Sequence, residues 1–180
     1  MVKLENKLKI KKIKIGILGG SFDPAHKGHL AISKEALKKF NLKSIIWSIT
    51  KQNPFKKKST NNLKKRILIC KNIIGKNKLI KIKYFEDIIN SNKISDLVDH
   101  LNKNKKYELF FLMGADNLIN FHKWHKWRNI LTKTKLIVFD RHGYKKKSLN
   151  SKTYKRLGKK RVFFIKFNKV NISSSQLKKI

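Results

Sequence analysis

The chain has 180 residues, with 46 Lys and Arg against 10 Asp and Glu, which gives a formal net charge of +36. This length suits one domain with a single core. A hydrophobic content of 40% argues against a disordered chain, although 31% of the residues are charged. The single cysteine, Cys70, excludes an intramolecular disulfide framework and a multi-cysteine metal cage. We therefore expect a folded, basic, cytoplasmic protein.

The positive charge comes from 41 Lys and only 5 Arg, in a chain that also holds 23 Ile and 17 Asn. Arg is the residue favoured for bidentate recognition of phosphates and bases, so its scarcity argues against a dedicated nucleic-acid reader. We interpret the Lys excess as compositional drift over solvated faces that also favours anionic substrates. Binding to nucleic acid is the alternative that the charge leaves open.

The N-terminal residues 1–12 form a short basic stretch that we expect to be a tail, followed by a single domain over 13–180. No apolar run approaches the roughly 20 residues that a membrane-spanning helix needs. We therefore expect no membrane contact. The oligomeric state is left open, a homo-oligomer included.

Strands and helices are predicted in alternation along the chain. Residues 13–18 are apolar and β-branched, which favours a buried strand, and residues 28–40 carry apolar side chains at helical spacing. The Lys-rich stretch 143–160 allows a helix, a long loop or both, and hydroxyl side chains within 171–175 can cap a closing helix. The remaining predicted strands are 44–49, 79–84, 108–113, 135–140 and 161–167, and the remaining predicted helices are 61–74, 95–102, 118–121 and 124–131.

This alternation predicts an α/β protein with a Rossmann-like, doubly wound, mostly parallel sheet that has helices on both faces. In such a sheet, ligands bind at the carboxyl ends of the strands, near the point where the strand order reverses.

The stretch GGSFDPAHKGH, residues 19–29, lies between the first predicted strand and the first helix. Its glycines let the backbone approach a ligand, and His26 and His29 stand three residues apart at the incoming end of the helix. The positive end of the helix dipole favours phosphate, and two histidines beside it would stabilise charge on a phosphoryl oxygen. We therefore predict a polyphosphate site, although neither a P-loop nor a GxGxxG pattern is present.

Other roles are open to these two histidines. They could be structural, or they could bind a metal together with Asp23, although a zinc site would need further ligands. We favour the functional interpretation because both occupy a glycine-rich turn between a strand and a helix.

Four further motifs follow in chain order: NPFK at 53–56, GADN at 114–117, FHKW at 121–124 and ISSS at 172–175. Together with residues 19–29, they resemble the motifs of the nicotinate-mononucleotide adenylyltransferases, in the HxGH nucleotidyltransferase superfamily. Pantetheine-phosphate adenylyltransferases usually have Thr at the position of His26, and cytidylyltransferases usually lack the GADN and Trp elements.

The resemblance implies an enzyme of NAD biosynthesis that joins ATP to nicotinate mononucleotide and releases pyrophosphate, aided by Mg²⁺. The mononucleotide phosphate would attack the ATP α-phosphorus in line, without a covalent enzyme intermediate. Two alternatives remain: the same reaction on nicotinamide mononucleotide or another phosphorylated acceptor, and a basic nucleic-acid-binding protein on a relic nucleotide fold.

The resemblance also implies residue roles. His26 and His29 would contact the ATP phosphates, Asp116 would accept hydrogen bonds from the adenosine ribose, and Trp124 would stack on the pyridine ring. Mg²⁺ would be held by the substrate phosphates rather than by protein side chains. The other implied ATP-binding residues are Gly19, Gly20, Ser21, Phe22, Gly28, Gly114, Ser173, Ser174, Ser175 and Lys178, and the other implied acceptor-binding residues are Asn53, Lys56 and Ser95.

Two positions depart from the family pattern. Lys178 stands where the family generally has Arg, and Ile94-Ser95 is the nearest match to a Tyr-Thr pair that helps to hold the nicotinate carboxylate. Outside the motifs, a local ion pair is the default expectation for Asp140 and Arg141. Side chains flanking Trp124, including His125, are expected to be partly exposed helix residues.

Overall fold

The computed structural model describes residues 11–53, 59–158 and 161–167. Six parallel strands form one sheet in the order β3-β2-β1-β4-β5-β6. The order reverses between β1 and β4, which is the position where doubly wound sheets bind their ligands. The strands are β1 (Ile13–Gly20), β2 (Ser44–Ile49), β3 (Ile80–Lys83), β4 (Tyr107–Gly114), β5 (Thr134–Phe139) and β6 (Val162–Ile165).

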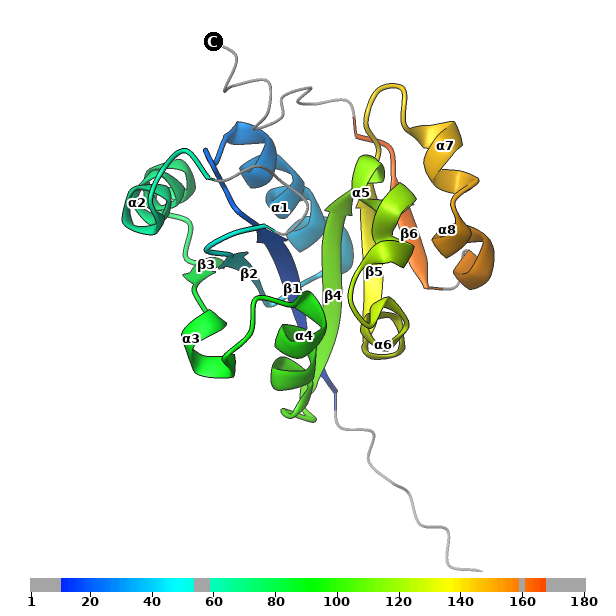
Figure 1. Cartoon of the computed structure of the whole chain (residues 1–180), viewed down its shortest axis with the longest axis horizontal. Coiled ribbons are helices and arrows are strands. Elements are labelled where there is room, and N and C mark those ends of the chain that lie inside the picture. The colour runs from blue at the N-terminus through cyan, green and yellow to red at the C-terminus, as the bar shows by residue number, and fades with distance from the viewer. Residues whose placement is uncertain (1–10, 54–58, 159–160, 168–180) are drawn as a thin grey trace, which may run out of the picture.

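Helices cover both faces of this sheet, as the alternation of elements predicts (Figure 1). Apolar residues of α1 and α2 pack in one core cluster, and those of α4, α5 and α6 pack in the other. The α-helices are α1 (Lys27–Phe40), α2 (Leu63–Ile74), α3 (Glu86–Ile89), α4 (Ile94–Asn102), α5 (Ala115–Asn120), α6 (Trp127–Lys133), α7 (Lys145–Leu149) and α8 (Lys152–Leu157), and a 3-10 helix, η1, covers Phe121–Lys123.

The side-chain pattern of β1 explains why it is a central strand of the sheet. Ile15 and Ile17 point into one core cluster while Leu18 points into the other, which is the period-2 alternation of an extended chain. Both faces of β1 are therefore buried, and a continuous apolar run is what such a strand requires.

Three local predictions differ from the structure. Helix α3 was not predicted, because four residues are too short to show a helical period. The helix predicted over 124–131 begins only at Trp127, because Lys126 adopts a left-handed conformation with φ of 45°. The predicted helix over 118–121 is α5 followed by η1. The uncertain Lys-rich stretch contains two short helices, α7 and α8.

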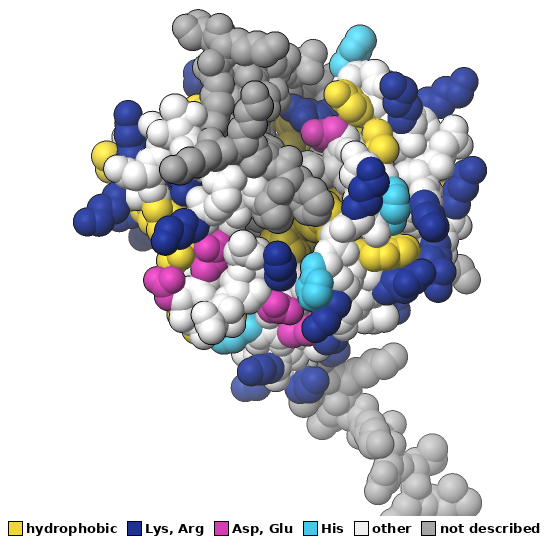
Figure 2. All heavy atoms as spheres, viewed as in Figure 1, with side chains coloured by type: hydrophobic (Ala, Val, Ile, Leu, Met, Phe, Trp, Pro, Cys, Tyr) yellow, Lys and Arg dark blue, Asp and Glu magenta, His cyan; other side chains and the backbone are white. Residues whose placement is uncertain are grey.

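Lys and Arg side chains are spread around the visible face and do not gather in one patch (Figure 2). This distribution agrees with solvated charge as the interpretation of the Lys excess. Within the part of the chain that the structure describes, no helix is both long and apolar enough to cross a membrane. Most of the expected tail, residues 1–12, lies outside the described residues.

Candidate active site

The loop that follows β1 is buried and tightly packed. Ser21, Phe22 and Asp23 are all buried, and Phe22 adopts a left-handed conformation with φ of 47°. A bulky residue seldom takes this conformation, so the surrounding structure must hold it there. The Phe22 ring stacks on Trp47, with centroids 5.0 Å apart and planes 18° apart, which supplies part of that support.

The two motif histidines cap the helix that follows the loop. His26 is the N-cap residue of α1, and its Nδ1 accepts a hydrogen bond from the backbone N–H of Gly28 at 3.1 Å. The Nδ1 of His29 accepts from the backbone N–H of His26 at 3.2 Å. Because Nδ1 accepts in both rings, the proton of each neutral imidazole lies on Nε2. The two rings lie side by side, with centroids 3.9 Å apart.

A buried chain of hydrogen bonds supports His29 from behind. The indole N–H of Trp47 donates to Ser33 Oγ at 2.9 Å, and the Ser33 hydroxyl donates to the His29 carbonyl at 2.8 Å. Ser33 and Trp47 are both fully buried. The expectation that both histidines occupy the incoming end of this helix is therefore confirmed, and their orientation is set by capping and by this chain.

Asp23 joins the loop after β1 to the residues that precede α2. Its buried carboxylate accepts hydrogen bonds from the backbone N–H of Thr60 at 2.7 Å and from the backbone N–H and side-chain amide of Asn61 at 3.1 and 2.8 Å. No group of three or more His, Cys, Asp or Glu that could hold a metal ion occurs among residues 11–53, 59–158 and 161–167. This part of the chain therefore gives the zinc alternative no support.

Asp116 and Gly114 meet at the carboxyl end of β4. The Asp116 Oδ2 accepts from Arg141 Nη1 at 2.7 Å, while its Oδ1 is buried with no hydrogen-bond partner. A Cβ at Gly114 would lie 2.4 Å from that Oδ1. The space that Gly114 leaves beside its backbone is thus occupied by the Asp116 carboxylate. A buried carboxylate oxygen without a partner is the acceptor that a ribose hydroxyl would satisfy.

The expected local ion pair between Asp140 and Arg141 was wrong. Arg141 turns to Asp116 across the strand ends, and Asp140 Oδ1 is buried without a hydrogen-bond partner. The guanidinium reaches the neighbouring strand because β4 and β5 run side by side.

A cavity of about 350 Å³ opens beside the first strand. A hollow with hydrophobic side chains at its base is visible on this face, with charged and histidine side chains around it (Figure 2). Of the predicted site residues, the cavity brings together Gly19, Gly20, Asn53 and Trp124. The Trp124 ring is held by Phe121 and Phe111, at centroid distances of 5.0 and 6.0 Å.

Glu86 ties one wall of the cavity to the end of β2. It accepts hydrogen bonds from the Thr50 hydroxyl and, at 3.0 Å, from the backbone N–H of Lys51. The hydroxyl of Tyr84 also faces Glu86, at 3.4 Å. Desolvation, followed by the negative charge of Glu86, raises the pKa of Tyr84 to about 12. This tyrosine therefore stays protonated at neutral pH.

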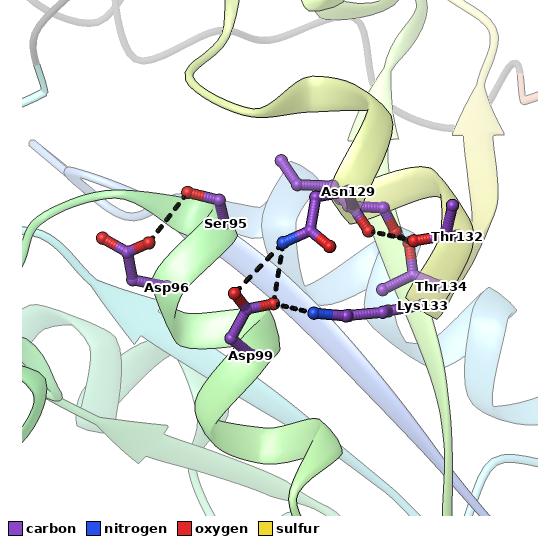
Figure 3. A network of polar contacts seen from close by, with 8 residues as sticks. Ser95, Asp96, Asp99, Asn129, Thr132, Lys133 and Thr134 are labelled. Atoms are coloured by element: carbon purple, nitrogen blue, oxygen red, sulfur yellow. Dashed lines mark hydrogen bonds and ion pairs between the residues drawn. The ribbon is translucent and has the colours of Figure 1, made fainter.

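Ser95, which the resemblance implied as an acceptor-binding residue, is not among the residues that line the cavity. It is 1% exposed, and its hydroxyl contacts Asp96 Oδ1 at 3.2 Å (Figure 3). The helix begins at Ile94, so Lys93 and Ile94 line the cavity while Ser95 turns into the protein. Asp96 also accepts from Ser91 Oγ at 2.7 Å, and this hydrogen bond lowers the pKa of Asp96.

A polar clamp joins the two helices beside the cavity. Asp99 of α4 accepts hydrogen bonds from the Asn129 amide at 2.9 and 3.1 Å, and it pairs with Lys133 Nζ at 2.6 Å (Figure 3). Asn129 and Lys133 both belong to α6. The clamp thus fixes α6, which begins three residues after Trp124, against α4.

Some predicted site residues lie outside the described residues: Lys56, Ser173, Ser174, Ser175 and Lys178. Other cavity residues were missed, among them Lys93, Lys123 and His125. His125 was expected on a helix, yet it lies in the turn before α6 and lines the cavity. Only its place directly after Trp124 could have signalled this.

Comparison with known proteins agrees with this geometry. A family model described as cytidylyltransferase-like matches residues 17–180. A protein of Pelagibacter ubique (strain HTCC1062), named "Probable nicotinate-nucleotide adenylyltransferase", is 64% identical over 180 residues, which is the full length of both chains. The chain belongs to the cytidylyltransferase-like family of nicotinate-nucleotide adenylyltransferases.

More distant members of the family extend the comparison. A relative of the same name from Aquifex aeolicus (strain VF5) is 34% identical over 89% of this chain and 98% of its own. The solved structure of Plasmodium falciparum nicotinic acid mononucleotide adenylyltransferase complexed with NaAD matches with a TM-score of 0.75. It covers 92% of this chain and 82% of its own, at 21% identity, and so supports the fold. The predicted Rossmann-like fold is therefore confirmed.

Proposed function

We propose that the chain catalyses adenylyl transfer from ATP to nicotinate mononucleotide, giving nicotinate adenine dinucleotide and pyrophosphate. The observation that carries this proposal is the pair of His26 and His29 at the N-terminus of α1, in the loop region that follows β1, together with a cavity lined by the last residues of β1 and by Trp124. Family membership supports the same reaction.

In the proposed reaction, a phosphate oxygen of the mononucleotide attacks the α-phosphorus of ATP. A new P–O bond forms, the bond from the α-phosphorus to the bridging oxygen breaks, and pyrophosphate leaves with the electron pair. The attacking phosphate is already an anion, so the enzyme needs to position two anions and stabilise charge. The Nε2–H groups of His26 and His29 can donate to phosphoryl oxygens, and the positive end of α1 adds to this stabilisation.

Asp116 is proposed to hold the ribose of ATP. Its Oδ1 is the partnerless buried acceptor at the end of β4, and its Oδ2 is oriented by Arg141. One carboxylate oxygen can therefore receive a ribose hydroxyl while the other stays fixed.

The cavity is proposed to hold the acceptor nucleotide. Trp124 offers an aromatic surface for a pyridine ring. Lys93 and Lys123 add positive side chains to the wall of the cavity, and His125 adds an imidazole. The carboxylate of Glu86 already accepts hydrogen bonds from the Thr50 hydroxyl and the Lys51 backbone N–H. This balance favours an acceptor that carries a carboxylate, as nicotinate does, over the neutral nicotinamide.

Mg²⁺ is proposed to enter with ATP as the Mg²⁺ complex of its phosphates. The described residues provide no cluster of acidic or histidine side chains that would bind the ion by themselves. Its role is to neutralise phosphate charge. A cytoplasmic location and a homo-oligomer remain predictions.

Pyrophosphate release by the purified protein tests this proposal, with ATP, Mg²⁺ and one of three conditions: nicotinate mononucleotide, nicotinamide mononucleotide or no acceptor. Release that depends on the nicotinate form is the expected result. Equal release with both mononucleotides would contradict the proposed acceptor selectivity. No release with either, from folded protein, would contradict the proposed function, and a salt-dependent shift of RNA would then favour the nucleic-acid alternative.

A further inference from the structure

Arg66 is a buried arginine that none of the motifs includes. It lies on α2, in the same row as Cys70 and Ile74, and only 1% of its surface is exposed. Residues four apart share one face of a helix, so this row points into the core. An arginine in such a position must have its donors satisfied within the protein.

The Arg66 guanidinium donates only to backbone carbonyls. Nη1 donates to the carbonyls of Ser21 at 2.6 Å and Thr50 at 2.7 Å. Nη2 donates to the carbonyl of Lys51 at 2.9 Å, and Nε donates to that of Asn61 at 3.0 Å. One planar group thereby joins three chain segments: the loop after β1, the end of β2 and the start of α2.

The bond to Ser21 acts at the strained point of the loop. The Ser21 carbonyl belongs to the peptide unit whose orientation defines φ of Phe22, the residue held at 47°. Fixing this carbonyl helps to hold Phe22 in its left-handed conformation. Phe22 in turn contacts His29, with ring centroids 4.9 Å apart.

The bonds to Thr50 and Lys51 act on the other side of the site. The Thr50 backbone N–H donates to the Gly20 carbonyl at 3.0 Å, so the two loops already touch. Thr50 lines the cavity, and Glu86 holds both Thr50 and Lys51 from the opposite wall. Arg66 thus lies behind the junction between the histidine motif and the cavity.

The positive charge of Arg66 is stabilised by backbone carbonyls and not by a carboxylate. No described carboxylate oxygen lies within 4 Å of the guanidinium, and its four partners are carbonyl dipoles. A buried ion in such surroundings is costly unless its geometry is well satisfied. A lysine could not reproduce the fork, because its ammonium presents a compact point charge.

We propose that Arg66 is a positioning residue of the transfer reaction: without touching substrate, its guanidinium fork fixes the histidine loop and the end of β2 relative to each other, and thereby the ATP phosphates relative to the acceptor phosphate. This proposal rests on the proposed function. Small displacements between reacting groups are enough to slow a reaction of this kind.

The test compares Arg66→Lys and Arg66→Gln with the wild-type protein, at a temperature well below their melting points. Arg161→Lys and Arg161→Gln are matched controls, since Arg161 Nη1 donates to the carbonyls of Leu131 and Thr132 at 2.7 and 3.3 Å, where β6 begins. The readouts are kcat, the KM for each substrate and the melting temperature.

For both Arg66 variants, the expected result is a fall in kcat of roughly 10- to 100-fold, as misplacement by about an ångström can produce. Arg66→Lys should be impaired although it keeps the charge. The Arg161 variants should lower the melting temperature at most and leave kcat unchanged. An Arg66 variant with wild-type kcat would overturn the proposal, and so would failure of both Arg66 variants to fold, since Arg66 would then be a folding residue.

A binding measurement separates this proposal from the proposed function. ATP alone should raise the melting temperature of the wild-type protein, and it should raise that of Arg66→Lys by less. If the wild-type protein shows no turnover but this difference persists, the proposed function fails while the role of Arg66 in arranging the ATP site stands. If ATP raises the melting temperature of both proteins equally and Arg66→Lys has the wild-type kcat, Arg66 has no positioning role.

Discussion

The backbone N–H of His26 donates to Nδ1 of His29 at 3.2 Å, so the two motif histidines are joined through the cap of the helix that carries them. This contact gives each imidazole two tasks. Nδ1 stabilises the start of α1, and Nε2 presents a proton for a phosphate. The two tasks can be separated by mutation, because other side chains cap helices without offering an imidazole.

His29→Gln should slow turnover strongly while keeping the cap of α1. Gln at the third helical position is the usual partner in a capping box, so its side chain can accept the His26 N–H. We expect kcat to fall roughly 10²- to 10³-fold, as the loss of one donor to a developing oxyanion does. Steady-state kinetics and thermal melting measure both effects. His29→Ala should lose the same activity and also melt at a lower temperature. Wild-type turnover in folded His29→Gln would exclude the proposed role of the Nε2–H.

Asp116→Ala should weaken ATP binding. The variant loses the partnerless Oδ1 together with the ion pair to Arg141. A hydrogen bond to a charged group contributes about 1.5–3 kcal/mol, so we expect the KM for ATP to rise by roughly one to two orders of magnitude. The KM for the acceptor should change little.

Glu108→Gln is the matched control for Asp116, because Glu108 pairs with Lys135 at the opposite end of the same strand, β4. It should leave the KM for ATP unchanged. An unchanged ATP dependence in Asp116→Ala would remove Asp116 from the proposed ribose site.

Gly19→Ala should narrow the acceptor cavity. A Cβ at this position would lie 2.7 Å from Ile94 Cδ1, and both residues line the cavity. Overpacking of this kind costs about 1–3 kcal/mol, so we expect the KM for the acceptor to rise by roughly tenfold. Ile94→Val removes the clashing methyl group, and the double variant should regain most of the lost affinity. Failure of Ile94→Val to rescue would show that the effect arises elsewhere in the strand.

Cys70 should resist alkylation in the folded protein. Burial raises the pKa of its thiol to about 12, although the nearby Arg66 charge acts in the opposite direction. At about pH 8, iodoacetamide should label Cys70 only after denaturation, since the thiolate is the reactive form. Mass spectrometry measures the labelling. Because the unfolded thiol loses its proton above about pH 8.5 and the folded one does not, stability should fall as the pH rises past that value. Rapid labelling of the native protein would contradict this prediction.

The strands and the helices that cover them were largely predictable from the sequence. The central parts of β1 and β4, residues 15–18 and 109–113, are apolar runs that are buried on both faces of the sheet, and α1 shows a clear helical period. The histidine motif could likewise be placed at a strand-to-helix turn, because its glycines and Pro24 separate the apolar run of the predicted strand from the helical spacing of the next segment.

The walls of the cavity could not be predicted in the same way. Helix α3 is one turn long, too short to show a helical period, and Ser95 is buried on α4 while its neighbour Ile94 lines the cavity. Ser95 was predicted from the resemblance, because Ile94-Ser95 is the nearest match to the family's Tyr-Thr pair, and that match does not say which of the two side chains faces the cavity. Element boundaries carry no strong sequence signal when neither end has a capping side chain.

Arg66 was hidden for a different reason. It follows Lys64 and Lys65 at the start of α2, so it looks like part of a solvated basic run. Its spacing of four residues to the buried Cys70 was the available signal. Composition could not reveal that this charge has backbone carbonyls as its partners.

The most direct test of the proposed transfer uses ATP labelled at the α-phosphorus, with nicotinate mononucleotide and Mg²⁺, in the wild-type protein and in His29→Gln. The label should appear in the dinucleotide product of the wild-type protein, and ATP labelled at the γ-phosphorus should give labelled pyrophosphate. His29→Gln should form the same products far more slowly. Label from the α-phosphorus in AMP alone, or label from the γ-phosphorus in free phosphate, would contradict attack of the acceptor phosphate on the α-phosphorus.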